Sequence, residues 1–194
     1  MLKKSFFALL MTATAAASVF AAPAATAEAA KTVAEKKLPN LMANSNFDGI
    51  KKLPGNWRYW RPNRNAKLTI DEKAGFNGTG GVVMSGDKAA LFSYFAIQPG
   101  SKLFMRAKVC KFGEAKASVS LRFHKQNGSW HGRTVSQKVK FGKDGEWTTV
   151  EMVVVAPKDA YKAVPMLDAN SFASPESKVI FDELEVYDIS GTAK

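Results

Sequence analysis

The stretch AKASVSLRFH, residues 115–124, decides the fold class because its apolar and polar side chains alternate without interruption. Ala117, Val119, Leu121 and Phe123 fall on one side of an extended chain, and lysine, serine, arginine and histidine side chains fall on the other. An alternation of period two is typical of a β-strand that buries one face. The stretch therefore predicts a half-buried strand.

Similar short runs, separated by turn residues such as Pro99-Gly100 and Asn127-Gly128, fill the chain on both sides of this stretch. The further strand candidates are 67–71, 81–85, 89–98, 102–112, 133–141, 147–156, 161–168 and 178–188. No segment carries a sustained helical stripe. The pattern predicts one all-β domain over 38–190, a two-sheet antiparallel β-sandwich of the jelly-roll type.

The start of the chain has the features of an export signal. Lys3 and Lys4 precede an apolar, Ala-rich stretch with small-residue cleavage sites, which predicts a signal peptide over 1–21, with cleavage as late as residue 29 as an alternative. We expect a disordered leader over 22–37, because it is rich in Ala, Lys and Glu, and a short tail over 191–194. The mature protein is then secreted or periplasmic, with no membrane insertion after cleavage. The single cysteine, Cys110, lies in an apolar run and is expected to be a buried thiol.

The chain is strongly basic. Its formal net charge is +11 from 28 Lys and Arg against 17 Asp and Glu, and loss of Lys3 and Lys4 leaves 26 against 17, or +9. Such a charge favours polyanions, among them acidic or sulfated glycans, although it also serves solubility alone. Export argues against nucleic acid as the partner.

Six short motifs follow one another along the predicted domain. They are LMANSNFD at 41–48, PGNW at 54–57, GFNGTGGV at 75–82, FAIQPGSKL at 95–103, DGEWTTV at 144–150 and VIFDELEV at 179–186. In this order the chain resembles the galactose-binding-like (jelly-roll) carbohydrate-binding modules, similar to the xylan- and glucan-binding modules appended to bacterial glycoside hydrolases. The resemblance implies a non-catalytic module that binds a polysaccharide. Because no catalytic domain is attached here, association with separate carbohydrate-active enzymes or with the cell surface is expected.

Sugar rings stack on exposed aromatic side chains, and neighbouring polar groups orient their hydroxyls. The densest cluster of this kind runs from Trp57 to Arg64. Trp57 matches the tryptophan of the resembled modules and is expected in the core, which leaves Tyr59, Trp60 and Arg61 as candidate ligand residues. The alternative is that these aromatics close one end of the sandwich.

A second candidate site lies on the polar sides of 102–112 and 115–124. If these strands pair as a hairpin, Arg106, Arg122 and His124 join one basic strip, with Trp130 in the loop beyond. Arginines in such a strip would suit a uronate or a sulfated sugar. The alternative is an ordinary solvated sheet face.

Asp182 alternates with Ile180, Leu184 and Val186, so we expect its carboxylate to point into the apolar face. A buried carboxylate needs a partner. The resemblance implies a structural calcium between the first and last strands, held here by Asp48 and Asp182. Hydrogen bonds from backbone amides, or an arginine partner, are the alternatives.

The sequence gives little support for catalysis, so the protein is not expected to be an enzyme. A small polysaccharide lyase would use His124 as base, Tyr94 as acid and Arg122 to neutralise a uronate, and would need all three in one cleft. A structural or adhesion domain of the cell envelope that binds protein is the other alternative, and it predicts that the aromatics at 57–60 and 130 are packed inside.

Overall fold

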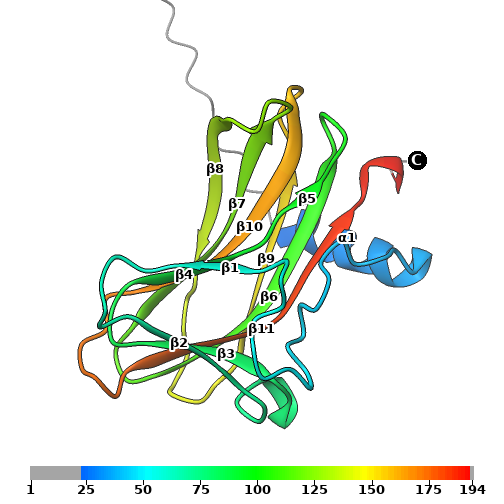
Figure 1. Cartoon of the computed structure of the whole chain (residues 1–194). Coiled ribbons are helices and arrows are strands. Elements are labelled where there is room, and N and C mark those ends of the chain that lie inside the picture. The colour runs from blue at the N-terminus through cyan, green and yellow to red at the C-terminus, as the bar shows by residue number, and fades with distance from the viewer. Residues whose placement is uncertain (1–22, 193–194) are drawn as a thin grey trace, which may run out of the picture.

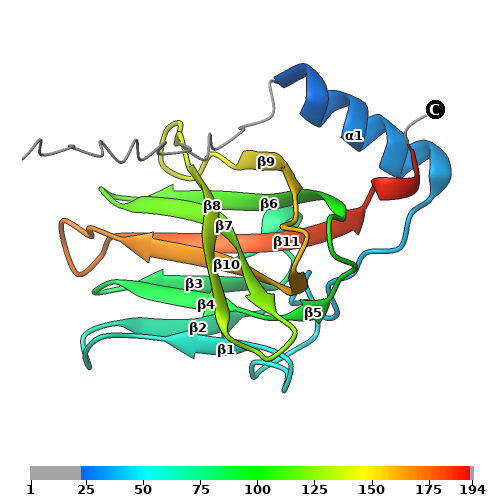
Figure 2. The ribbon, with the colours of Figure 1, turned by 90° about the horizontal axis from the view of Figure 1, so that it is seen from above.

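The computed structural model describes residues 23–192, and within them the strands form two antiparallel sheets packed face to face (Figures 1 and 2). Sheet A has the order β1 (Arg58–Trp60), β4 (Ala89–Phe92), β10 (Ala160–Asn170), β7 (Lys116–Lys125) and β8 (Trp130–Lys138), with β5 (Phe95–Ala96) also paired to β10. Sheet B has the order β2 (Lys67–Asp71), β3 (Gly81–Ser85), β11 (Lys178–Asp188), β6 (Lys102–Phe112) and β9 (Thr148–Val155). The predicted two-sheet β-sandwich is confirmed.

The core lies between the sheets and contains the residues that the alternation placed on one side of each strand. Leu121 and Phe123 of β7 face Phe181 of β11 across it, and all three side chains are fully buried. Trp57 is buried beside Phe47, with ring centroids 5.2 Å apart, which confirms its predicted place in the core. Burial of apolar surface on this scale is the main stabilising contribution to such a domain.

The predicted strand over 89–98 is two strands, β4 and β5, with Ser93 and Tyr94 between them. Both pair with β10, and Pro165 of β10 lies opposite the break. A proline has no N–H to donate, so the ladder of hydrogen bonds is interrupted there. Only the Ser93 amide bridges the gap, donating to the Pro165 carbonyl at 3.3 Å.

The expected hairpin of 102–112 with 115–124 was wrong. Strand β6 pairs with β11 and β9 in sheet B, whereas β7 pairs with β10 and β8 in sheet A. The short connection at Gly113 therefore crosses from one sheet to the other, and the outward side chains of β6 and β7 lie on opposite sides of the molecule.

The expected disordered leader over 22–37 is instead helix α1 (Pro23–Lys36), which lies beside the C-terminal end of β11 (Figure 2). Its Ala29 and Val33 are buried against Phe104, Tyr187 and neighbouring apolar side chains on the outer face of sheet B. Contacts with the sheet stabilise a helix whose own amphipathic pattern is weak. At the other end, the 3-10 turn η2 (Ser190–Thr192) replaces part of the expected tail.

The predicted signal peptide lies outside the described residues. In the part of the chain that the structure describes, no helix is long and apolar enough to cross a membrane.

Candidate functional site

The outer face of sheet A, which points away from sheet B, carries most of the predicted ligand residues. The pairing register aligns its outward residues in rows across the strands. One row is Trp60, Ala90, Asp168, Ser118 and Lys138; the next is Arg58, Phe92, Met166, Ser120 and Ser136; Val164, Arg122 and Thr134 follow, and then Ala96, Lys162, His124 and Trp130. Because the sheet order is β1-β4-β10-β7-β8, Trp60 and Trp130 lie on its two outermost strands.

An apolar strip runs through the centre of this face. Ala90, Val164 and Met166 form a cluster with the half-buried ring of Phe92, separate from the main core. Large aromatic side chains on the same face remain exposed: Trp60 is 47%, Tyr94 53% and Trp130 58% exposed. Flat aromatic rings flanking an apolar floor are the surface on which sugar C–H faces stack.

Asp168 lies within the same face, and the sequence analysis did not select it. It accepts a hydrogen bond from the Ser120 hydroxyl at 3.1 Å. Partial burial raises the pKa of the Asp168 carboxyl, and the hydrogen bond from Ser120 and the positive charge of Arg122 oppose that effect. A half-buried carboxylate beside an arginine can accept hydrogen bonds from sugar hydroxyls and orient them.

Near one end of the face is a cavity of about 270 Å³, lined by Phe92, Tyr94, His124, Lys162 and other residues. His124 Nδ1 lies 2.8 Å from the Gly128 carbonyl oxygen. A carbonyl only accepts hydrogen bonds, so Nδ1 carries the proton and Nε2 of a neutral ring is left as an acceptor. The structure thus brings together His124 and Tyr94, two of the three residues that the lyase alternative requires, while Arg122 lies on the same face but does not line the cavity.

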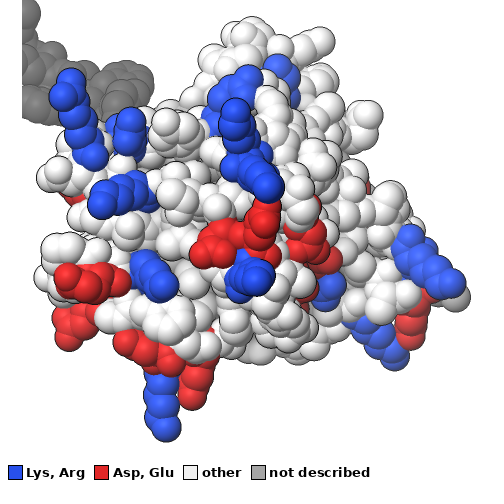
Figure 3. Space-filling view, turned by 60° about the horizontal axis from the view of Figure 1, so that its bottom comes forward, with Lys and Arg blue, Asp and Glu red and all other residues white. Residues whose placement is uncertain are grey.

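The charged strand residues that the register places on this face are mostly basic. Asp168 is the one acid among them, against five basic side chains: Arg58, Lys116, Arg122, Lys138 and Lys162. Figure 3 shows a different distribution over the part of the surface in view, where acidic and basic side chains lie interspersed in small groups. The predicted basic strip, which required Arg106 beside Arg122 and His124, is therefore not formed, because β6 and β7 belong to different sheets. The basic side chains on sheet A come from β1, β7, β8 and β10 instead.

Three of the predicted ligand residues lie away from this face. Arg106 is on the outer face of sheet B, where its guanidinium forms an ion pair with Glu185. Tyr59 and Arg61 lie at the side of the sandwich, with the Arg61 guanidinium carbon 5.8 Å from the centre of the Tyr59 ring. Successive residues of a strand point to opposite faces, which separates Tyr59 from Trp60.

The prediction that Asp182 points between the sheets was wrong, although the side chain is fully buried. A β-bulge between Asp182 and Glu185, with Glu183 at a φ of 46°, places Asp182 on the outer side of sheet B, opposite Lys108. The loop containing η1 (Phe76–Gly78) covers it there.

The Asp182 carboxylate accepts three hydrogen bonds within the chain. Oδ2 accepts from the Phe76 amide at 2.8 Å and the Thr79 hydroxyl at 3.1 Å, and Oδ1 accepts from the Glu183 amide at 2.7 Å. Burial still raises the pKa of Asp182 to about 6, against the lowering by these hydrogen bonds. The alternative of a carboxylate bound by backbone amides is thus what the structure contains.

Calcium at this loop stays a prediction. Asp48 and Asp182 hold the same loop, since Asp48 Oδ1 accepts from the Gly80 amide at 2.8 Å. Across residues 23–192, no group of three or more His, Cys, Asp or Glu could hold a metal ion. Carbonyl oxygens would therefore have to complete a calcium site.

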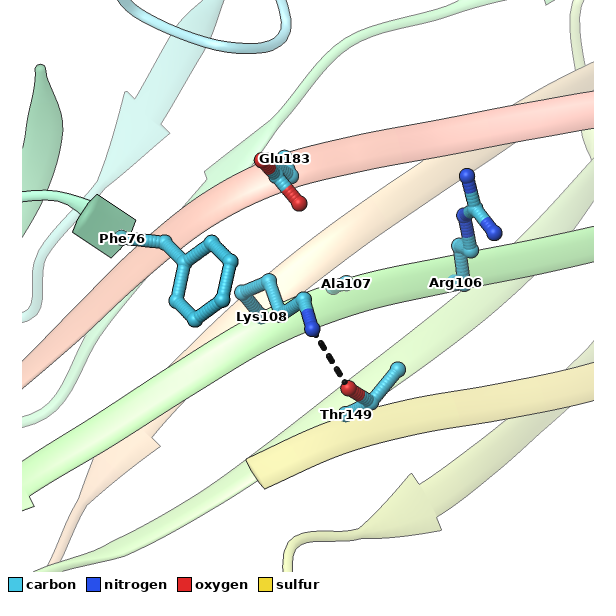
Figure 4. Close-up of a pocket in the computed structure, with 6 residues that line it drawn as sticks. All are labelled: Phe76, Arg106, Ala107, Lys108, Thr149 and Glu183. Atoms are coloured by element: carbon cyan, nitrogen blue, oxygen red, sulfur yellow. Dashed lines mark hydrogen bonds between the residues drawn. The ribbon is translucent and has the colours of Figure 1, made fainter. Parts of the chain in front are cut away.

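Figure 4 shows a small cavity beside the bulge, of about 190 Å³, lined by residues of β6, β9, β11 and η1. Lys108 crosses it, with Nζ 4.3 Å from the centre of the Phe76 ring. The same Nζ donates a hydrogen bond to the Thr149 hydroxyl at 3.0 Å. The Lys108 side chain thus contacts both walls of the cavity, and the cavity is lined by no exposed aromatic ring.

The residues that the sequence analysis missed on sheet A had a recognisable signal. Strands β4 and β10 are apolar on both sides, with Ala89 and Leu91 facing the core and Ala90 and Phe92 facing out. A strand of this composition is expected to be covered on both faces. Here only one face is covered within the described chain, which leaves an apolar strip exposed on the other face.

Comparison with known proteins adds information about the fold. No family model matches the sequence, and no curated protein matches it. Among solved structures, the enzymatically active domain of bacteriophage CBA120 tailspike protein 4 is similar at a TM-score of 0.61 and 16% identity, over 77% of this chain and 21% of that one. The family 22 carbohydrate-binding module with its attached xylanase from Clostridium thermocellum, solved with xylohexaose, is similar at 0.58 and 16%, over 80% and 29%.

The isolated family 22 xylan-binding module of Paenibacillus barcinonensis is similar at a TM-score of 0.54 and 9% identity, over 79% of this chain and 96% of that module. The chain thus spans less than a third of the first two proteins but nearly the whole of this one. The resemblance that the six motifs predicted is confirmed at the level of the fold: this chain has the jelly-roll β-sandwich of the carbohydrate-binding modules.

Proposed function

We propose that the protein is a non-catalytic module that binds a polysaccharide on the outer face of sheet A. The observation that carries the proposal is the apolar strip of Ala90, Phe92, Val164 and Met166, with Trp60 exposed on the neighbouring strand and Trp130 exposed at the opposite edge of the same face. Exposed rings on the same sheet face as a contiguous apolar strip are typical of a ligand-binding surface. The module fold supports the same conclusion, since modules of this fold include xylan-binding ones.

The polysaccharide is acidic in this proposal. Five basic side chains against the single acid Asp168 favour a ligand that carries carboxylate or sulfate groups. Arg122 is the side chain best suited to a carboxylate, because its guanidinium can donate two parallel hydrogen bonds. The site of action is outside the cytoplasm, on a cell surface or beside separate carbohydrate-active enzymes.

Affinity electrophoresis against xylan, polygalacturonate and a sulfated glucan tests the proposal. We expect retardation by an acidic polysaccharide, and loss of most of it in Trp60→Ala and Arg122→Ala. Arg106→Ala is the matched control, because it removes an arginine from the opposite sheet and should leave retardation unchanged. A folded wild-type protein that no polysaccharide retards would contradict the proposal.

One observation favours a second candidate function, polysaccharide lyase activity: His124 and Tyr94 line the same cavity. His124 Nε2 would take a proton from the sugar ring and Tyr94 would protonate the departing glycosidic oxygen, leaving a double bond in the product. Incubation with polygalacturonate and measurement of unsaturated sugar separates the two functions. Binding without any unsaturated product supports the module.

A further inference from the structure

A second cavity lies at the side of the sandwich, between the edge strands of the two sheets. Strands β1 and β2 stand at the ends of the two sheet orders, and residues of both line the cavity together with the segment 51–53. Its volume is about 440 Å³, within the range of small-ligand sites. It is larger than the cavity on the outer face of sheet A.

The floor of this edge cavity is aliphatic and its walls are aromatic and basic. Leu68 and Ile70 of β2 form part of the floor and pack against the core with their other sides. Tyr59 forms a wall and is 49% exposed. Arg61 lies over its ring, with Nη1 donating to the Ala66 carbonyl at 3.3 Å, and this one bond leaves its other donors for a ligand.

The charged side chains that line the edge cavity are all basic. Lys51, Lys52 and Arg61 are all exposed, and no acidic side chain lines the cavity. Glu72 is the acid that pairs nearby, with Lys51 at 3.8 Å, in an exposed ion pair that contributes little. A ligand here meets a flat ring, an aliphatic floor and three positive charges.

We propose that the edge cavity is a second binding site, which takes one acidic sugar residue with its C–H face on Tyr59 and its carboxylate or sulfate on Arg61 and Lys52. This inference rests on the proposed function, since it assigns an acidic polysaccharide to the protein. Tyr59 and Trp60 point to opposite sides of β1, so a sugar on the sheet face does not contact Tyr59. The protein then binds two ligand segments at once, which raises its avidity for a polymer.

Calorimetric titration with a short oligogalacturonate and with a sulfated glucan oligosaccharide tests the second site, with neutral xylohexaose for comparison. We expect two acidic oligosaccharides per protein in the wild type and one in the double variant Tyr59→Ala/Arg61→Ala. Loss of the charged hydrogen bonds of Arg61 alone should weaken the edge site by roughly tenfold or more. Arg64→Ala removes a nearby exposed arginine that does not line the cavity and serves as the matched control.

The sheet-face variant Trp60→Ala/Arg122→Ala separates the second site from the proposed function. We expect it to retain one oligosaccharide, bound at the edge cavity, and to lose that one on addition of Tyr59→Ala/Arg61→Ala. One oligosaccharide in the wild type, unchanged by Tyr59→Ala/Arg61→Ala, overturns the edge site and leaves the sheet-face site standing. No binding of any oligosaccharide by the folded wild type overturns both, and binding of an acidic peptide but of no sugar would assign the cavity to a protein partner.

Discussion

In the absence of metal, the buried carboxylate of Asp182 should make this protein more stable as the pH falls from 7.5 to 5. Burial raises the pKa of Asp182 from 3.8 to about 6. A carboxyl whose pKa is higher in the folded than in the unfolded state binds protons preferentially when folded. Its contribution is therefore complete below the unfolded pKa and is lost as the pH rises through 6.

The magnitude follows from the shift. The full effect is about 3 kcal/mol, and between pH 7.5 and pH 5 about 1.4 kcal/mol of it is gained. Asp182→Asn removes the titrating group but keeps the shape of the side chain and an oxygen for the Phe76 amide. The free energy of unfolding of the wild type, minus that of Asp182→Asn, should thus increase by about 1.4 kcal/mol as the pH falls from 7.5 to 5.

Urea unfolding at several pH values, with chelator present, measures this difference. Glu176→Gln, which neutralises an exposed carboxyl, controls for the change in net charge. A difference that stays flat from pH 7.5 to pH 5 in chelator would refute the reasoning. With calcium in excess, an ion bound to Asp182 would hold the carboxylate ionised, and the acid stabilisation should disappear. An identical pH dependence with and without calcium would contradict the predicted calcium site.

Three further predictions concern the helix, a glycine and the charge of the ligand. Val33→Asp places a charge where α1 packs against Phe104 and Tyr187, so the free energy of unfolding, measured by urea denaturation, should fall by about 2–3 kcal/mol. Lys31→Asp on the exposed side of the helix should leave it nearly unchanged. Gly80→Ala would put a Cβ 2.1 Å from the Phe47 carbonyl oxygen, so we expect the free energy of unfolding to fall by more than about 2 kcal/mol, or the protein not to fold. Gly55→Ala, whose Cβ would meet nothing within 4 Å, is the control. Equal melting temperatures of the two variants would contradict the packing around Gly80. Binding of an acidic polysaccharide should weaken steadily between 0.05 and 0.5 M salt, and a salt-independent affinity would exclude the role given to Arg122.

The positions of the strands could be predicted from the sequence because the alternation of apolar and polar residues is a local pattern. The alternation of 102–112 and of 178–188 predicts the bounds of β6 and β11 as they stand in the structure. Helix α1 could not be predicted in the same way, because its weak pattern is stabilised by contacts with Phe104 and Tyr187, which are distant in the sequence.

Which strands become neighbours was not predictable from alternation, and most of the errors in the site follow from this. Arg106 and Arg122 have the same polar-side pattern, and nothing near Gly113 in the sequence indicates that the chain changes sheets there. The bulge after Asp182 likewise inverts the expected direction of one side chain without a local signal. The proposed binding face could be predicted only in part, because strand register, and not sequence proximity, brings Phe92 and Asp168 onto the same face as Trp60.

The central claim is that polysaccharide binds on the outer face of sheet A, and the indole N–H signals in a ¹⁵N NMR spectrum test it most directly. The chain has four tryptophans, of which Trp60 and Trp130 lie on this face, Trp57 is in the core and Trp147 packs against Phe76 on the other side. On titration with an acidic polysaccharide fragment, the account predicts that the signals of Trp60 and Trp130 move while those of Trp57 and Trp147 stay. Movement of the Trp147 signal alone, or of none of the four in a protein that binds the fragment, would contradict it.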